Sequence, residues 1–119
     1  MTEFLAELSL IAPPVGEGAY AFVAEDGGCN GWVQFIVRSD TLIEIHRLWT
    51  LRPGKGNGSM MLRVVCGLAD KHGIEIKLKA LPFGRKPFKM SGDELAAWYQ
   101  RHGFSGTWRK MIRKPQRGL

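Results

Sequence analysis

Three glycines and a lysine lie close together in the segment Leu51-Arg-Pro-Gly-Lys-Gly-Asn-Gly-Ser59. A turn that carries few side chains exposes its main-chain N–H groups, and a helix that starts there adds unpaired N–H groups and the positive end of its dipole. Such a turn suits a phosphate or a pyrophosphate. We expect Lys55 to add a positive charge and Ser59 to cap the following helix. An ordinary glycine-rich loop is the alternative.

Spacing excludes two common phosphate-binding motifs. A P-loop needs Gly-Lys followed by Ser or Thr, and the chain contains no such triplet. A Rossmann turn needs G-x-G-x-x-G, and here Ser59 stands where the third glycine belongs. A phosphate cradle at this turn would therefore be of another kind.

The segments around the turn predict a strand, a helix and a second strand. Residues 41–50 are rich in Leu, Ile and Trp, and residues 60–72 carry apolar side chains at helical spacing, with Gly73 as a natural C-cap. Residues 74–80 alternate strictly between apolar and charged side chains, which predicts a strand with one covered face. A strand, a crossover helix and a second strand indicate a parallel β-α-β unit.

The N-terminal third predicts an antiparallel meander. Residues 3–12 fit either a helix or a strand, and the apolar run that stops before Pro13 favours the strand. Residues 19–24 and 32–37 are expected strands, separated by turn-forming residues at 25–31.

The C-terminal third begins with a long loop at 81–92 that contains two prolines and three basic residues. Ser91-Gly-Asp-Glu94 is a capping box that starts a helix ending near Gly103. Residues 104–112 are expected to form a final strand.

Two motifs together resemble the signatures of the GNAT superfamily of N-acetyltransferases. Residues 53–58 are similar to the R/Q-x-x-G-x-G motif that binds the pyrophosphate of acetyl-CoA, although Pro53 replaces the first residue and Arg52 stands one position earlier. About 40 residues later, 95–104 resembles a short helix bearing a tyrosine before Gly-Phe, Y-x-x-x-G-F. The resemblance covers roughly residues 41–110.

The resemblance implies an α/β (α+β) fold with a mixed, mostly antiparallel sheet, a central splayed parallel strand pair and two or three helices. The pantetheine arm of acetyl-CoA would enter between the two parted strands, 41–50 and 74–80. Main-chain groups would make most of the contacts with acetyl-CoA. The implied cofactor-binding residues are Leu48, Trp49, Thr50, Arg52, Gly54, Lys55, Gly56, Asn57, Gly58 and Ser59.

The resemblance also implies catalytic roles for Tyr99 and Glu44. Tyr99 would return a proton to the departing thiolate as general acid; otherwise it is an aromatic side chain that packs its helix against the sheet. Glu44 would deprotonate the amine through water, and a solvated carboxylate is the alternative. His46, two residues further along the predicted strand, shares its face. The ordinary imidazole pKa near 6.5 suits a base, although a structural histidine is the commoner role.

The expected activity is transfer of acetyl from acetyl-CoA to a primary amine of a small molecule or protein by direct attack, without a metal. The alternative is an inactive GNAT-like module that binds a protein or nucleic acid through its basic C-terminal segment. A nucleotide-binding domain is a third reading of the same anion cradle. A homodimer is left open, because the short N-terminal part predicts an open acceptor side.

The bulk properties predict one soluble domain at 1–112 and a basic tail at 113–119. Residues 109–119 hold five basic side chains and no acid, so most of the net charge of +6 lies at that end. No apolar run approaches the roughly 20 residues that span a bilayer. The acidic N-terminus lacks the basic flank of a signal peptide. Cys29 and Cys66 form no metal-binding motif, and we expect two free thiols in the cytoplasm.

Overall fold

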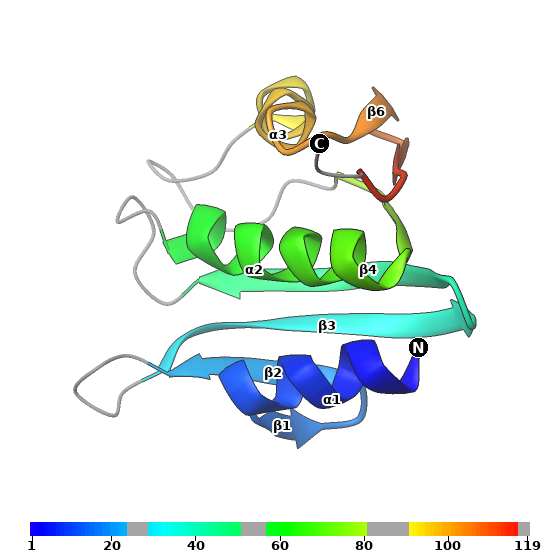
Figure 1. Cartoon of the computed structure of the whole chain (residues 1–119). Coiled ribbons are helices and arrows are strands. Elements are labelled where there is room, and N and C mark those ends of the chain that lie inside the picture. Colours follow the sequence, from blue (N-terminus) through cyan, green and yellow to red (C-terminus); the bar gives the residue numbers. More distant parts are fainter. Residues whose placement is uncertain (24–28, 51–56, 81–90, 117–119) are drawn as a thin grey trace.

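A computed structural model of the chain describes residues 1–23, 29–50, 57–80 and 91–116. Over these ranges the chain folds as one mixed sheet with helices packed on it (Figure 1). In chain order the elements are α1 (Thr2–Ile11), β1 (Pro14–Gly16), β2 (Ala19–Val23), β3 (Cys29–Ser39), β4 (Leu42–Thr50), α2 (Asn57–His72), β5 (Glu75–Leu78), α3 (Gly92–Gln100), β6 (Ser105–Thr107) and β7 (Lys110–Arg113).

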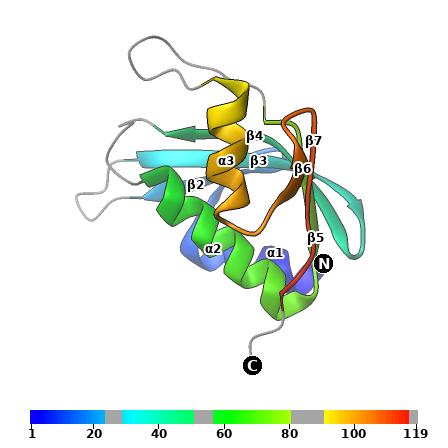
Figure 2. The same cartoon turned by 90° about the horizontal axis from the view of Figure 1, so that it is seen from above.

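The sheet has the strand order β1-β2-β3-β4-β5-β7-β6. Its neighbours are antiparallel except for β4 and β5, which are parallel and joined through α2. The predicted meander and β-α-β unit are therefore confirmed, and so is the expected fold class. Helices α1 and α2 lie on the same face of the sheet (Figures 1 and 2).

The core lies between that face and the helices. Strand residues two apart, such as Ile43 and Ile45 in β4 or Ile76 and Leu78 in β5, are buried, while the residues between them face the other way. Helix α2 buries residues at helical spacing, among them Met61 and Val65. As predicted, Gly73 ends this helix with a φ of +67°, and Ile74 N donates to Ala69 O (2.8 Å).

The N-terminal segment is a helix, so the preference for a strand at 3–12 was wrong. Phe4 and Leu8 are one helical turn apart, fully buried and packed in the core. Glu7 on the same helix contacts α2, where Lys71 Nζ donates to Glu7 Oε1 (2.7 Å). The cause is tertiary: burial of the Phe4–Leu8 stripe outweighs the ambiguous local pattern. The N-terminal part therefore does supply a helix to the fold.

Three further expectations need correction. Strand β3 already begins at Cys29, inside the predicted turn 25–31. The expected single strand at 104–112 is a hairpin of β6 and β7, which turns around Trp108. Arg113, assigned to the basic tail from the sequence, lies in β7, is 4% exposed and bonds Asp70 of α2.

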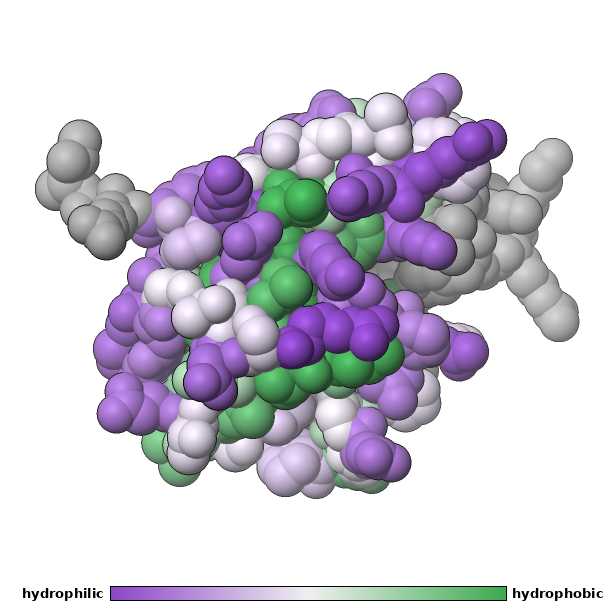
Figure 3. All heavy atoms as spheres, turned by 90° about the vertical axis from the view of Figure 1, so that its right-hand side faces the viewer, coloured by the Kyte–Doolittle hydropathy of each residue, from purple (hydrophilic) through white to green (hydrophobic). Residues whose placement is uncertain are grey.

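Hydrophilic residues cover most of the end of the molecule at which the β3–β4 hairpin lies, around a band of hydrophobic ones (Figure 3). The exposed large hydrophobic residues of β3 include Ile36 and Val37, which precede that hairpin. Among the residues that the structure describes, no helix is long and apolar enough to cross a membrane.

Candidate active site

Strands β4 and β5 pair over only part of their length. The register runs from Leu42↔Glu75 to Ile45↔Leu78, where β5 ends. Strand β4 continues to Thr50, and its pairing with β3 continues there as far as Thr50↔Gly31. The two central parallel strands thus do not pair along the whole of β4, as the expected splayed pair requires.

The opening coincides with a β-bulge in β4. Gln34 of β3 pairs with Arg47, and the next residue, Phe35, pairs with Ile45, so His46 is the extra residue. A bulge bends a strand and increases its twist. This gives a local physical reason for β4 to diverge from β5 directly after Ile45.

The bulge also changes which side chains face the core. Ile45 and Leu48 are buried, whereas the two residues between them, His46 and Arg47, are both exposed. The sequence carries this signal: the apolar residues of the strand are spaced by two at Ile43 and Ile45 and then by three at Leu48. Reading 41–50 as a regular strand missed it.

A cavity of about 440 Å³ lies beside the bulge. Its lining residues are Glu17, Gly18, Gln34, Phe35, Ile36, Val37 and His46. The β1–β2 turn forms one wall, because Phe35 N donates to Gly18 O (3.0 Å) and Gln34 Nε2 donates to Glu17 O (3.4 Å). A side chain at Gly18 would meet Phe35 O at 2.5 Å, and its φ of +67° also favours glycine. The sequence analysis did not anticipate this wall.

Glu44 lies between the buried residues Ile43 and Ile45 of β4, so its side chain points to the sheet face away from α1 and α2. Its carboxylate accepts from Arg38 Nη2 (3.0 Å) and lies 3.4 Å from Lys77 Nζ. The hydrogen bond from Arg38, followed by its charge and that of Lys77, lowers the pKa of Glu44. The carboxylate therefore stays ionised but is a weak proton acceptor.

Tyr99 lies on the helix side of the sheet, in the core cluster that also contains Leu48. It is 5% exposed, and its ring lies 5.3 Å from that of Phe104, which places the two motif residues together. Burial, followed by the nearby Cys66 thiol, raises the pKa of Tyr99 well above its usual range. Tyr99 therefore holds its proton at neutral pH and could serve as a proton donor but not as a base. Tyr99 and Glu44 are on opposite faces of the sheet.

The expected phosphate cradle is described only at its helical end. Residues 51–56, which include Arg52, Gly54, Lys55 and Gly56, lie outside the described residues. Helix α2 begins at Asn57, so Ser59 is its third residue and the expectation that Ser59 caps the helix was wrong. Its hydroxyl instead accepts from Trp98 Nε1 (3.1 Å). The main-chain N–H groups of the first turn have no carbonyl partner within the helix.

Comparisons with known proteins agree with this architecture. No family model matches the sequence, and no curated protein matches it. Ard1 from Thermoplasma volcanium is similar in structure, with a TM-score of 0.62, 17% identity, and coverage of 98% of this chain and 80% of that chain. A GNAT superfamily phosphinothricin acetyltransferase from Sinorhizobium meliloti, in complex with AcCoA, has a TM-score of 0.55, 18% identity, and coverage of 99% and 71%. Aminoglycoside 6'-acetyltransferase type Ii has a TM-score of 0.57 and 18% identity, and the match covers 85% of this chain and 70% of that chain.

The chain has the GNAT fold. Within it, the sequence analysis did not anticipate the role of Trp98. The indole links α3 to the first turn of α2, and a Cβ on Gly58 would lie 3.6 Å from it. That distance is an ordinary contact, and the hydrogen bond from Trp98 to Ser59 is what joins the two helices beside the expected cradle.

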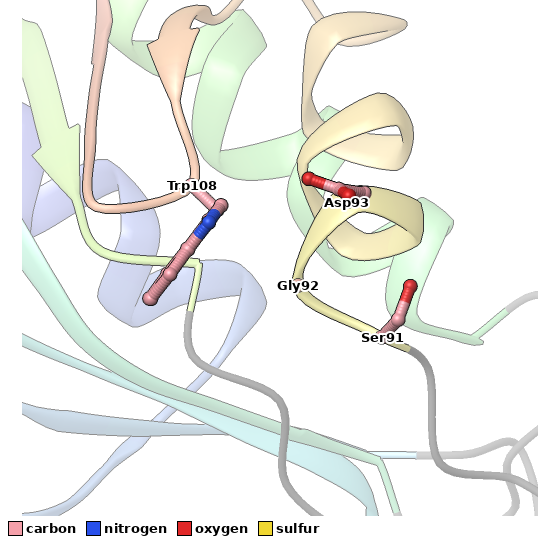
Figure 4. Close-up of a pocket in the computed structure, with 4 residues that line it drawn as sticks. All are labelled: Ser91, Gly92, Asp93 and Trp108. Atoms are coloured by element: carbon pink, nitrogen blue, oxygen red, sulfur yellow. The ribbon is translucent and has the colours of Figure 1, made fainter.

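A second, smaller cavity of about 210 Å³ lies in this GNAT fold between the first turn of α3 and the β6–β7 hairpin (Figure 4). Its lining residues are Ser91, Gly92, Asp93 and Trp108. The predicted capping box is confirmed, since Ser91 Oγ accepts from Glu94 N and Glu94 Oε1 accepts from Ser91 N. Arg109 lies over the Trp108 ring, 5.0 Å from its centroid. Among the described residues no group of three or more His, Cys, Asp or Glu side chains could hold a metal.

Proposed function

We propose that this protein transfers an acetyl group from acetyl-CoA to a primary amine of a small molecule or a protein by direct attack. The observation that carries the proposal is the partial pairing of β4 with β5, which ends at Ile45, directly before the bulge at His46. An extended ligand can add its main chain to an open strand edge. The fold and the two motifs support the choice of acetyl-CoA as that ligand.

Main-chain groups of Leu48, Trp49 and Thr50 would bind the pantetheine arm in this proposal. The first-turn N–H groups of Asn57, Gly58 and Ser59 would bind the pyrophosphate, aided by the helix dipole. Arg52, Gly54, Lys55 and Gly56 would complete the cradle. Binding through the main chain tolerates Pro53 where the motif has Arg or Gln, because the N–H groups do not depend on that side chain.

The opposite placement of Tyr99 and Glu44 fits a direct displacement. The amine nitrogen forms a bond to the carbonyl carbon from the side of Glu44 and His46, and the carbon–sulfur bond breaks. Tyr99 delivers its proton to the departing thiolate from the helix side, and the amine proton leaves toward the base. His46 is exposed at the bulge, whereas Glu44 is held by two cations, so His46 is the stronger candidate to accept the proton directly.

The decisive test is the substitution Tyr99→Phe. It keeps the ring in the core and removes only the hydroxyl, so CoA binding should persist while thioester cleavage slows by about 10²-fold. Thiol release with an amine panel measures cleavage, and the rise in melting temperature on adding acetyl-CoA measures binding. Tyr20→Phe is the matched control, because Tyr20 stacks on Phe35 (5.2 Å) away from the motif and should leave both readings unchanged.

Two outcomes would count against the proposal. If acetyl-CoA leaves the melting temperature unchanged, the cradle does not bind it, and a partner-binding module becomes the better explanation. If Tyr99→Phe turns over at the normal rate, the tyrosine is a packing residue and not the acid. Glu44→Gln and His46→Gln then separate the two candidate bases, since only loss of the base should remove the acidic limb of the pH–rate profile.

A further inference from the structure

One face of α2 meets the C-terminal part of the chain along its whole length. Ser59, Arg63, Cys66 and Asp70 are spaced by four, three and four residues, so they form one stripe on the helix. At one end of the stripe, Ser59 Oγ accepts from Trp98 Nε1 (3.1 Å). At the other end, Asp70 forms a two-point bond with Arg113 (2.6 and 3.0 Å). Arg63 lies between these two anchors.

His102 lies beside this stripe, one turn beyond Trp98. The Trp98 and His102 rings are 5.2 Å apart, and Arg113 Nε donates to His102 O (2.8 Å). The two residues that bond the ends of the stripe, Trp98 and Arg113, therefore also contact His102. Trp98 contacts Ser59 at one anchor of the stripe and Arg113 contacts Asp70 at the other, so His102 lies beside the part of α2 that carries Arg63. The pKa of His102 is lowered by burial and then by the charges of Arg63, Arg101 and Arg113.

The positive charge of this cluster is not balanced by nearby acids. Arg63 and Arg101 are exposed, and across the described ranges neither forms an ion pair with a carboxylate. Asp70, the acid on the same stripe, is already bonded to Arg113 and to Gln116 N (2.7 Å). Two free guanidinium groups beside an imidazole form a strong site for a phosphate dianion, because each guanidinium can donate two parallel hydrogen bonds.

The cluster also lies at a suitable distance from the expected cradle. Arg63 follows Ser59 by one helical turn, a rise of about 6 Å along α2. In CoA the ribose carries a 3′-phosphate next to the pyrophosphate, so a second phosphate follows the first at short range. Arg63 comes from the second turn of α2, and Arg101 and His102 directly follow α3.

We propose that Arg63, Arg101 and His102 bind the 3′-phosphate of CoA, so that the protein distinguishes CoA from its 3′-dephospho form. This rests on the proposed function, since it assumes that the pyrophosphate lies at the start of α2. The proposal adds a selectivity that neither sequence motif provides. The glycine-rich turn would bind the diphosphate, and this cluster would bind the 3′-phosphate.

Isothermal titration with CoA and with 3′-dephospho-CoA tests the proposal on the full chain. Wild type should bind CoA about tenfold more tightly. Arg63→Ala and Arg101→Ala should each reduce this ratio severalfold, and the double variant should bring it close to one, while the affinity for dephospho-CoA stays within about twofold. Both arginines are exposed, so the variants should keep the wild-type melting temperature. Arg109→Ala is the control, because Arg109 is also exposed but stacks on Trp108.

The outcomes separate this inference from the proposed function. If wild type binds both ligands equally, the 3′-phosphate site is refuted while the acetyl-CoA proposal stands. If the arginine variants weaken both ligands by the same factor, the arginines act on the diphosphate or on the fold, and the selectivity proposal is wrong. If wild type binds neither ligand, both proposals fail together.

Discussion

The two halves of strand β4 perform different tasks. The first half, Leu42–Ile45, is paired with β3 on one side and with β5 on the other, and it carries the buried residues Ile43 and Ile45. The second half follows the bulge at His46 and extends past the end of β5. One strand thus anchors the centre of the sheet and then diverges from its parallel neighbour.

This difference shows how a small fold can open a strand edge without weakening its core. The first half fixes the register through side chains that are buried on the helix side, where a one-residue slip would expose them. The bulge then confines the irregularity to one residue. Leu48, which follows the bulge, is only 6% exposed and belongs to the core. The second half of β4 is therefore held by its pairing with β3 and by the burial of the Leu48 side chain.

The largest expected effect tests this difference in packing. Ile43→Ala should lower the free energy of unfolding by about 3–4 kcal/mol, because Ile43 is fully buried between paired strands on both sides. Leu48→Ala should cost about 2 kcal/mol, since a cavity beside the strand opening can collapse more easily. Urea denaturation of both variants measures the two losses.

Equal losses in the two variants would contradict the comparison, because they would show that both halves are packed alike. An exposed residue of the same strand provides the control. Arg47→Ala removes a side chain that projects from the sheet beside the bulge, and it should change the unfolding free energy by less than about 0.5 kcal/mol.

The next effect concerns the bulge itself. Deleting His46 would restore regular alternation, since Leu48 would then follow Ile45 at a spacing of two. We expect β4 to straighten toward β5, with a loss of about tenfold in acetyl-CoA affinity and little loss of stability. Titration calorimetry and thermal denaturation separate the two quantities. His46→Ala, which keeps the bulge, should bind acetyl-CoA normally; a deletion variant that also binds normally would show that the bulge is not needed.

Much of this fold could be predicted because local and tertiary preferences agree. The alternating residues of β5, the Gly73 cap and the Ser91–Glu94 capping box each specify one structure whatever surrounds them, and all three are confirmed. The segment Thr2–Ile11 could not be assigned, because its apolar residues fit two periods and only the contact of Phe4 and Leu8 with the rest of the core selects the helix.

The sequence names candidate residues for the site through its motifs but does not give their geometry. Tyr99 and Phe104 belong to one motif, and the structure adds that their rings lie 5.3 Å apart. The Arg113–Asp70 bond could not be foreseen, because it joins residues 43 positions apart and a basic run near a terminus usually stays solvated. The ion pairs of Glu44 were likewise hidden, since Lys77 comes from the parallel partner strand.

The smallest expected effect is electrostatic and lies in the first half of β4. Arg38 and Lys77 lower the pKa of Glu44 in the folded chain, so the ion pairs contribute stability above the carboxylate's unfolded pKa and lose it as the pH falls through the folded value. Acidification from neutral pH should therefore destabilise wild type more than Glu44→Gln. The difference should stay under about 1 kcal/mol because the pairs are partly exposed.

Urea denaturation at neutral and acidic pH measures this difference in unfolding free energy. Taking the difference between the two proteins removes the contribution of Asp70 and Glu7, which titrate in both. Parallel pH dependence in the two proteins would mean that the ion pairs of Glu44 do not stabilise the paired half of β4, and Glu44 would then be free to serve as a base.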